Sequence, residues 1–140
     1  MGKTTTSLRL DDALRERLAG QAALQGTSLT ALVERMLREG LAIDEHPGIV
    51  FKPGPSGRRA ALAGGPDVWE IASALRRMSG TETEQVRAAA LEFGLHERQI
   101  MIALNYIAAN RKEIDDRVEA NDRAHDEGER LAAERKRLFV

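Results

Sequence analysis

The chain has 140 residues with 21 basic and 22 acidic side chains, three histidines and no cysteine, which gives a net charge of -1. This length suits one ordinary domain or two very small ones. The lack of cysteine excludes disulfides and thiolate metal sites. No apolar run approaches the ~18 residues that a membrane-spanning helix needs, and the N-terminus lacks the hydrophobic segment of a signal peptide. We therefore expect a cytoplasmic protein with no membrane partner.

The basic side chains are unevenly distributed. Residues 1–10 contain Lys3 and Arg9 without an acid, and residues 46–66 contain Lys52, Arg58 and Arg59 without an acid. Because nucleic-acid binding requires a local basic face rather than a basic protein, the near-neutral total does not exclude DNA as a partner.

Residues 5–10, with the sequence TTSLRL, predict a single β-strand in a chain otherwise patterned for helices. Strand side chains alternate between two faces. One face would carry Thr6, Leu8 and Leu10, and the other Thr5, Ser7 and Arg9. The second set offers hydroxyl and guanidinium groups that suit base edges and phosphates. No matching strand follows in the first half of the chain, so we expect the partner strand to come from a second copy.

Two helices are predicted after this strand. Asp11-Asp12 suits a helix start, and the helix is expected to run to about Gln25, with Gly26 ending it. Ser28 is the predicted N-cap of a second helix, which has Gly40 near its end. These forty or so residues hold too few aliphatic side chains for a core of their own. Pairing two copies closes the strand edge and buries more surface, so we expect an obligate homodimer or a higher oligomer built from it.

The segment TSLRLDDALRERLAGQAALQGTSLTALVERMLREGL resembles a ribbon-helix-helix domain of the Arc, MetJ and CopG type. The resemblance implies an antiparallel ribbon, made of one strand from each copy, lying in the DNA major groove. Thr5, Ser7 and Arg9 would then contact bases. Thr27, Ser28 and Thr30, at the start of the second helix, would contact a phosphate.

A glycine- and proline-rich stretch follows Glu45 and excludes helix there. Residues 49–51 and 60–62 flank the turn residues, which predicts a short β-hairpin. Its basic residues Lys52, Arg58 and Arg59 suit DNA phosphates, an acidic protein surface or a solvated turn, and the sequence does not choose among these.

Three helical segments are predicted between residues 66 and 110. The first begins with Pro66 in its first turn, and its Trp69 is expected to be a core anchor packed on the hairpin. Residues 81–84 form a capping-box pattern that opens the second, Gly94 ends it, and the third begins around His96. The last two resemble a generic helix-turn-helix, which would present Glu97, Arg98 and Gln99, and we expect this pair to pack rather than to contact DNA.

Residues 46–109, with GRRAALAGGPDVWEI and LNYIAA, also resemble the small DUF433-type domains of antitoxins. Together the two resemblances imply an antitoxin that represses its own operon and neutralises a PIN-like ribonuclease.

The last thirty residues alternate opposite charges at helical spacing and predict a long, mostly solvated helix, with Gly128 as a candidate break. A sparse apolar stripe ends in Leu138 and Phe139 and suits a partner's groove. The toxin-binding candidates are Arg130, Leu131, Arg135, Arg137, Leu138 and Phe139, whose arginines would enter the acidic metal site of the nuclease. A second dimer contact or a frayed tail is the competing interpretation.

The sequence therefore predicts a mainly α protein with short β-structure. Its parts would be a ribbon-helix-helix domain (1–44), a hairpin-and-helices domain (45–110) and a charged helix (111–140). The histidines lack metal-ligand spacing and there is no phosphate loop or nucleophile motif, so we expect no enzyme activity, metal or cofactor. Two functions remain: an antitoxin, or a stand-alone ribbon-helix-helix regulator without a toxin. A third, a purely structural adaptor, would require the ribbon face to be inert.

Overall fold

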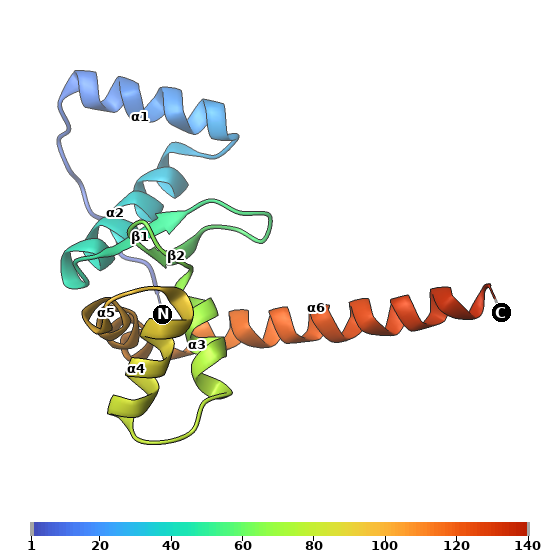
Figure 1. Ribbon diagram of the computed structural model, residues 1–140. Helices are drawn as coiled ribbons and strands as arrows, with labels where there is room; N and C mark the ends of the chain where they lie inside the picture. The colour runs from blue at the N-terminus through green and yellow to red at the C-terminus, as the bar shows by residue number, and fades with distance from the viewer. Residues whose placement is uncertain (1, 140) are drawn as a thin grey trace. The chain divides into compact units, whose positions relative to one another are not determined.

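The computed structural model describes residues 2–139, and over this range the chain forms six helices and one two-stranded antiparallel sheet (Figure 1). The prediction of a mainly α protein with short β-structure is confirmed at this level. The chain divides into two compact units, with the boundary between Ala42 and Ile43. The charged segment was predicted as a separate part, residues 111–140, and the helix observed there, residues 111–137, belongs to the second unit.

The first unit contains helix α1 (Asp12–Gln25) and most of helix α2 (Leu29–Glu45). Asp11 caps α1, since its carboxylate accepts from the Leu14 amide at 3.2 Å. Gly26 ends α1 in the left-handed conformation, with φ of 65°. Ser28 Oγ accepts from the Ala31 amide at 3.1 Å, which confirms the predicted cap of α2.

Gly40 was predicted near the end of α2, and the helix continues five residues beyond it, to Glu45. A glycine inside a helix costs only about 1 kcal/mol relative to alanine. A helix usually stops where proline or a left-handed residue follows, and here Pro47 and Gly48 come two and three residues after its end.

Residues 2–11 have neither helical nor strand geometry within the single chain, and their side chains are exposed. Leu8 and Leu10, predicted on the buried face of a ribbon, are among these exposed residues. The segment has one ion pair with α2, between Lys3 Nζ and Glu34 Oε2 at 3.2 Å. The ribbon requires a second chain, so it stays a prediction.

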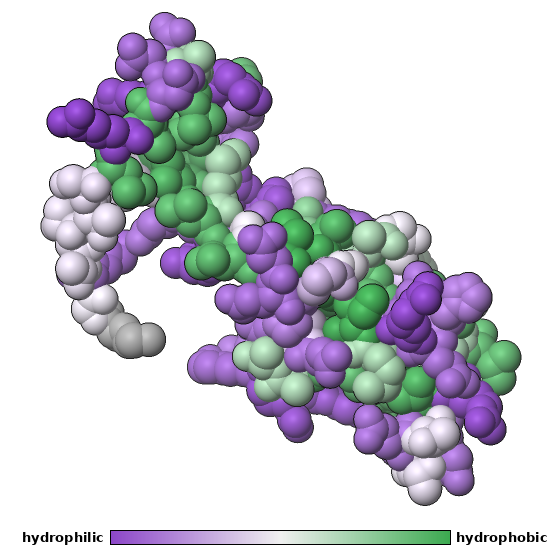
Figure 2. Space-filling model, turned by 90° about the vertical axis from the view of Figure 1, so that its left-hand side faces the viewer, coloured by the Kyte–Doolittle hydropathy of each residue, from purple (hydrophilic) through white to green (hydrophobic). Residues whose placement is uncertain are grey.

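The first unit buries little of its own apolar surface. Among its described residues only Ala22 and Leu32 are buried hydrophobic side chains. Figure 2 shows hydrophobic residues at the surface of the protein. The large hydrophobic side chains exposed here are Leu8, Leu10, Leu14, Leu24, Met36, Leu37 and Leu41.

The second unit begins with the predicted hairpin, β1 (Ile49–Lys52) and β2 (Arg59–Leu62). The strands pair antiparallel, from Ile49 opposite Leu62 to Lys52 opposite Arg59. Ile49 and the apolar residues of β2 are buried, so the sheet contributes one side of a core.

Helices α3 (Val68–Arg76), α4 (Glu82–Phe93) and α5 (Glu97–Ala109) follow. Pro66 lies before the N-cap Asp67 and not in the first turn, which corrects that expectation. The Thr81–Glu84 capping box is confirmed: each residue's side chain accepts from the other's amide, at 3.2 and 3.3 Å. Gly94 ends α4 with φ of 65°, as predicted.

Helix α6 (Arg111–Arg137) completes the unit. Its first two turns supply Ile114 and Val118 to the core. Its C-terminal half extends away from the other helices of the unit (Figure 1). The candidate break at Gly128 is wrong, because the helix is continuous through it. The core residues of this unit include Ile49, Leu62, Val68, Ile71, Val86, Ala89, Ile100, Ala103, Tyr106, Ile114 and Val118.

Candidate functional site

The three residues predicted to contact bases lie in the N-terminal segment. Thr5, Ser7 and Arg9 are all exposed. Within residues 2–139, Arg9 forms no hydrogen bond or ion pair, so its guanidinium is available to an external acceptor.

The predicted phosphate contacts lie at the start of α2, where Thr27, Ser28 and Thr30 are exposed. The Ser28 hydroxyl is used as the helix cap and satisfies the Ala31 amide. No acceptor among the described residues binds the amides of Leu29 and Thr30. Unpaired amides at a helix N-terminus, together with the positive end of the helix dipole, suit an anionic oxygen.

The predicted toxin-binding residues all lie near the end of α6 and are exposed; they are Arg130, Leu131, Arg135, Arg137, Leu138 and Phe139. Leu138 and Phe139 are 77% and 88% exposed. Two of the arginines pair within the helix: Arg130 with Glu127 at 2.5 Å and Arg137 with Glu134 at 3.5 Å. Arg135 has no ion pair or side-chain hydrogen bond within residues 2–139.

The three basic residues of the hairpin are used inside the second unit. Lys52 Nζ donates to the Gly65 carbonyl at 3.0 Å. Arg58 Nη2 donates to the Phe51 carbonyl at 3.4 Å, and Arg59 Nη1 to the Pro53 carbonyl at 2.9 Å. These side chains therefore brace the turn rather than lie free in solvent.

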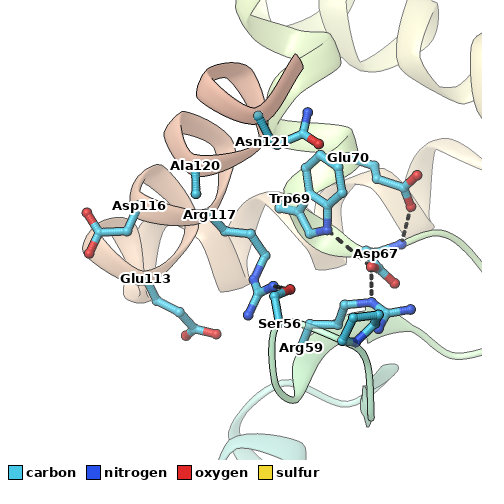
Figure 3. Close-up of a pocket in the computed structure, with 12 residues that line it drawn as sticks. Ser56, Arg59, Asp67, Trp69, Glu70, Glu113, Asp116, Arg117, Ala120 and Asn121 are labelled. Carbon is cyan, nitrogen blue, oxygen red and sulfur yellow. Dashed lines mark hydrogen bonds and ion pairs between the residues drawn. The ribbon is translucent and has the colours of Figure 1, made fainter. Parts of the chain in front are cut away.

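An open groove lies between the hairpin turn, the start of α3 and one face of α6, with a volume of about 880 Å³ (Figure 3). Its lining residues are Pro55, Ser56 and Arg59 from the hairpin, Asp67, Trp69 and Glu70 from the start of α3, and Glu113, Asp116, Arg117, Ala120, Asn121 and Ala124 from α6. The lining contains four carboxylates and two arginines, so the groove carries a net negative charge.

Asp67 holds the floor of this groove together. Among the described residues, Asp67 is the one charged residue that is buried. Its Oδ2 accepts hydrogen bonds from Arg59 Nε and from Trp69 Nε1, the second at 3.1 Å. Its amide donates to Glu70 Oε2 at 2.9 Å. The expectation that Trp69 is a core anchor is wrong: the indole is only partly buried and borders the groove, with its N–H on Asp67 (Figure 3). A buried carboxylate near an indole N–H holds the ring at the surface.

The α6 wall of the groove is fixed by polar contacts. Arg117 Nη1 donates to Ser56 Oγ at 2.9 Å and ties α6 to the hairpin turn. Glu113 accepts from the Tyr106 hydroxyl at 3.0 Å. Lys112 donates to Asp116 at 2.7 Å, and this hydrogen bond, with the charge of Asp116, raises the pKa of Lys112 above its ordinary value of 10.5.

The helix-turn-helix-like pair α4 and α5 uses its exposed face for local contacts. Glu97 Oε1 on α5 lies 3.6 Å from Arg87 Nε on α4. Gln99 Oε1 accepts a hydrogen bond from the His96 amide at 2.9 Å. Arg98 is exposed. Val86 and Ile100 are buried and contribute to the unit's core.

The histidines have separate local roles. The His46 ring packs edge-on against the Tyr106 ring, with 5.3 Å between the ring centroids. His125 Nε2 lies 3.2 Å from Glu129 Oε1, one turn further along α6. Within the described part of the chain no group of three or more histidine and carboxylate side chains is placed to hold a metal ion. No helix between residues 2 and 139 is both long and apolar enough to cross a bilayer.

Sequence reasoning missed the groove as a site. The local sequence feature that marks the groove is Trp69, two residues after the helix cap Asp67. The α6 residues that form the opposite wall lie more than forty positions further along the chain, so sequence spacing does not reveal them.

Comparison of the chain with protein-family models, curated proteins and solved structures found no match.

Proposed function

We propose that the chain is a homodimeric, sequence-specific DNA-binding protein whose N-terminal segments pair as a two-stranded ribbon. The observation that carries this proposal is the set of apolar side chains that the first unit leaves exposed. Leu8 and Leu10 are exposed two residues apart in the N-terminal segment, and Leu37 and Leu41 are exposed one turn apart on α2. A second copy provides the apolar surface that these residues lack.

Pairing the segments would also create a DNA-facing surface. With Leu8 and Leu10 turned inward, Thr5, Ser7 and Arg9 lie on the opposite face of the ribbon. A two-stranded ribbon fits the major groove, and arginine binds guanine O6 and N7 with two hydrogen bonds. The free amides at the start of α2, beside Thr27 and Thr30, suit a flanking phosphate.

The second unit supplies the other half of the proposal, that the protein is the antitoxin of a toxin-antitoxin pair. A ribbon dimer needs no such extension to bind DNA. The end of α6 projects exposed leucine, phenylalanine and arginine side chains, which suit a protein partner with an apolar groove and an acidic centre. A PIN-like ribonuclease has such a centre, because carboxylates hold its metal ions.

Two experiments test the halves separately. Purified protein is expected to retard DNA from directly upstream of its own gene, in preference to a scrambled fragment of the same length and composition. Co-expression with the adjacent gene product is expected to rescue growth that this product alone inhibits. A neighbour that is harmless alone, combined with specific DNA binding, would instead identify a stand-alone regulator. Failure to bind the upstream DNA in preference to the scrambled fragment would overturn the DNA-binding half.

A further inference from the structure

One face of α6 leads directly out of the groove. Arg117 and Ala124 line the groove, and Leu131 and Leu138 follow Ala124 at intervals of seven residues. Residues seven apart lie on the same side of a helix, so this face runs from the groove to the end of α6. Leu131 is 51% exposed, and the face beyond Ala124 has no neighbour within the described chain except α6 itself.

The charges of α6 are divided along its length. Residues 111–127 carry four basic and seven acidic side chains, whereas residues 128–139 carry four basic and two acidic ones. The first part therefore has a net charge of -3 and the second of +2. Two α6 helices in parallel would place like charges side by side, whereas an antiparallel pair places each basic end against an acidic stretch.

We propose that the α6 helices of two copies pair antiparallel, so that the end of each helix occupies the groove of the other copy. The pairing centre lies between Glu127 and Gly128. Leu131 then packs on Ala124 of the second copy, and Leu138 reaches Arg117 at the groove. Small residues opposite leucines allow the two helices to approach closely.

The groove and the end of α6 have complementary chemistry. The groove has an excess of carboxylates and a partly exposed indole, and the incoming end carries Arg135, Lys136 and Arg137 beside Leu138 and Phe139. Phe139 provides an aromatic partner for Trp69, and the arginines lie near Asp116 and Glu113. In this pairing each copy completes the site of the other.

This self-pairing goes beyond the proposed function and does not depend on the ribbon. It uses Leu131 and Leu138, the same leucines assigned above to a toxin. A toxin that binds the end of α6 therefore has to displace the second copy, which makes the two associations mutually exclusive.

The absence of native cysteine allows a direct cross-linking test in the full chain. Gly128 lies next to the pairing centre, and a Cβ added there meets no atom within 4 Å, so Gly128→Cys is sterically free. Ala120→Cys, at a groove-lining position of the same helix, is the matched control. In the antiparallel pair the two copies of residue 120 lie roughly 20 Å apart along the helix axis, far beyond disulfide reach.

Gly128→Cys is expected to form the covalent dimer at least about tenfold faster than Ala120→Cys under mild oxidation, because the pairing raises the local thiol concentration. Equal rates, or efficient cross-linking at both positions as in a parallel pair, would overturn the proposal. Equal rates in a protein that still has the mass of a dimer would leave the ribbon dimer intact, so this failure is distinguishable from failure of the DNA-binding proposal.

Trp69 gives a second readout because it is the only tryptophan. Leu138→Glu is expected to expose Trp69, shifting its emission to longer wavelength and increasing quenching by acrylamide. Leu91→Glu, at an 80% exposed leucine of α4, is the matched control and is expected to leave Trp69 unchanged. Identical Trp69 spectra for both variants and the parent protein would mean that no second copy fills the groove.

Discussion

Arg59 and Asp67 form an ion pair that joins the second strand of the hairpin to the start of α3. The side chains are 27% and 10% exposed, and the same carboxylate also accepts from the Trp69 indole. One buried carboxylate therefore connects the hairpin, α3 and the groove.

Asp67→Ala is expected to lower the free energy of unfolding by about 2 kcal/mol. It leaves the Arg59 guanidinium and the Trp69 indole N–H without their acceptor, and removing one member of a buried pair costs about 3–5 kcal/mol when both groups are fully desolvated. The partial exposure of Arg59 reduces this cost. Urea unfolding followed by circular dichroism measures the change.

Two control variants separate the charge from the hydrogen bonds. Asp67→Asn keeps an acceptor for both donors and is expected to lose less stability than Asp67→Ala. Asp126→Ala removes an exposed carboxylate of α6 and is expected to change stability little. If Asp67→Ala is no less stable than Asp126→Ala, the carboxylate does not hold the hairpin on α3.

Sequence patterns predicted the elements whose signals are local. The caps of α1, α2 and α4 each depend on a side chain within three residues of the amide that it binds, and they were found correctly. The hairpin was found from turn residues between two apolar runs. The prediction of a break at Gly128 was wrong, because glycine lowers helix propensity without ending a helix, and α6 continues through it.

The groove depends on contacts that sequence spacing does not encode. Trp69 was expected in the core because tryptophan is large and apolar, but its N–H requires an acceptor, and Asp67 supplies one at the surface of the fold. In the sequence, Arg58 and Arg59 are candidates for phosphate contacts. In the fold, Arg58 donates to the Phe51 carbonyl and Arg59 donates to the Pro53 carbonyl. Only the tertiary fold brings Arg117 to Ser56, 61 positions away.

The exposed apolar face of the first unit leads to a prediction about its association. Leu37 on α2 is 56% exposed. Leu37→Lys is expected to place a charge in the proposed interface between two copies of the first unit, to weaken their association and to abolish binding to the upstream DNA. Gel retardation measures the loss of DNA binding, and light scattering measures the mass.

Leu91→Lys is the control for Leu37→Lys, since it makes the same chemical change at an exposed leucine of the second unit. It is expected to bind DNA like the parent protein. Combining Leu37→Lys with Leu138→Glu removes both proposed associations and is expected to give a monomer. A Leu37→Lys variant that binds DNA with unchanged affinity contradicts the ribbon.

The free guanidinium of Arg9 predicts a loss of specificity without a loss of structure. Arg9→Ala is expected to cost roughly 1–3 kcal/mol of discrimination at one base pair, the usual value of a two-bond contact to guanine. Competition between operator variants that differ at single positions measures this loss, and the mass of the protein should not change.

Arg98→Ala provides the matched control for Arg9→Ala and tests the helix-turn-helix-like pair at the same time. Arg98 is exposed on α5, and its removal is expected to leave operator affinity and base preference unaltered. If Arg98→Ala relaxes the base preference while Arg9→Ala does not, the DNA contact belongs to α5 rather than to the ribbon.

The arginines at the end of α6 differ in whether they must break an ion pair within the helix to bind a partner. Arg130 is held by Glu127 and Arg137 by Glu134, whereas Arg135 has no ion pair within residues 2–139. We therefore expect Arg135→Ala to weaken toxin binding the most, by about 2–5 kcal/mol if the guanidinium is buried against a carboxylate of the toxin. Calorimetric titration with the purified product of the adjacent gene measures this loss.

Arg130→Ala is the control for that measurement. An exposed pair within a helix contributes only about 0.3–0.5 kcal/mol, so breaking the Arg130 pair with Glu127 has a small cost and does not itself prevent toxin contact. The ion pairs alone therefore favour Arg135 only slightly, and a loss of about 2–5 kcal/mol requires that the Arg135 guanidinium itself reaches the acidic centre of the toxin. Equal losses for Arg130→Ala and Arg135→Ala would show that net charge at the end of α6, and not the free guanidinium of Arg135, determines toxin binding.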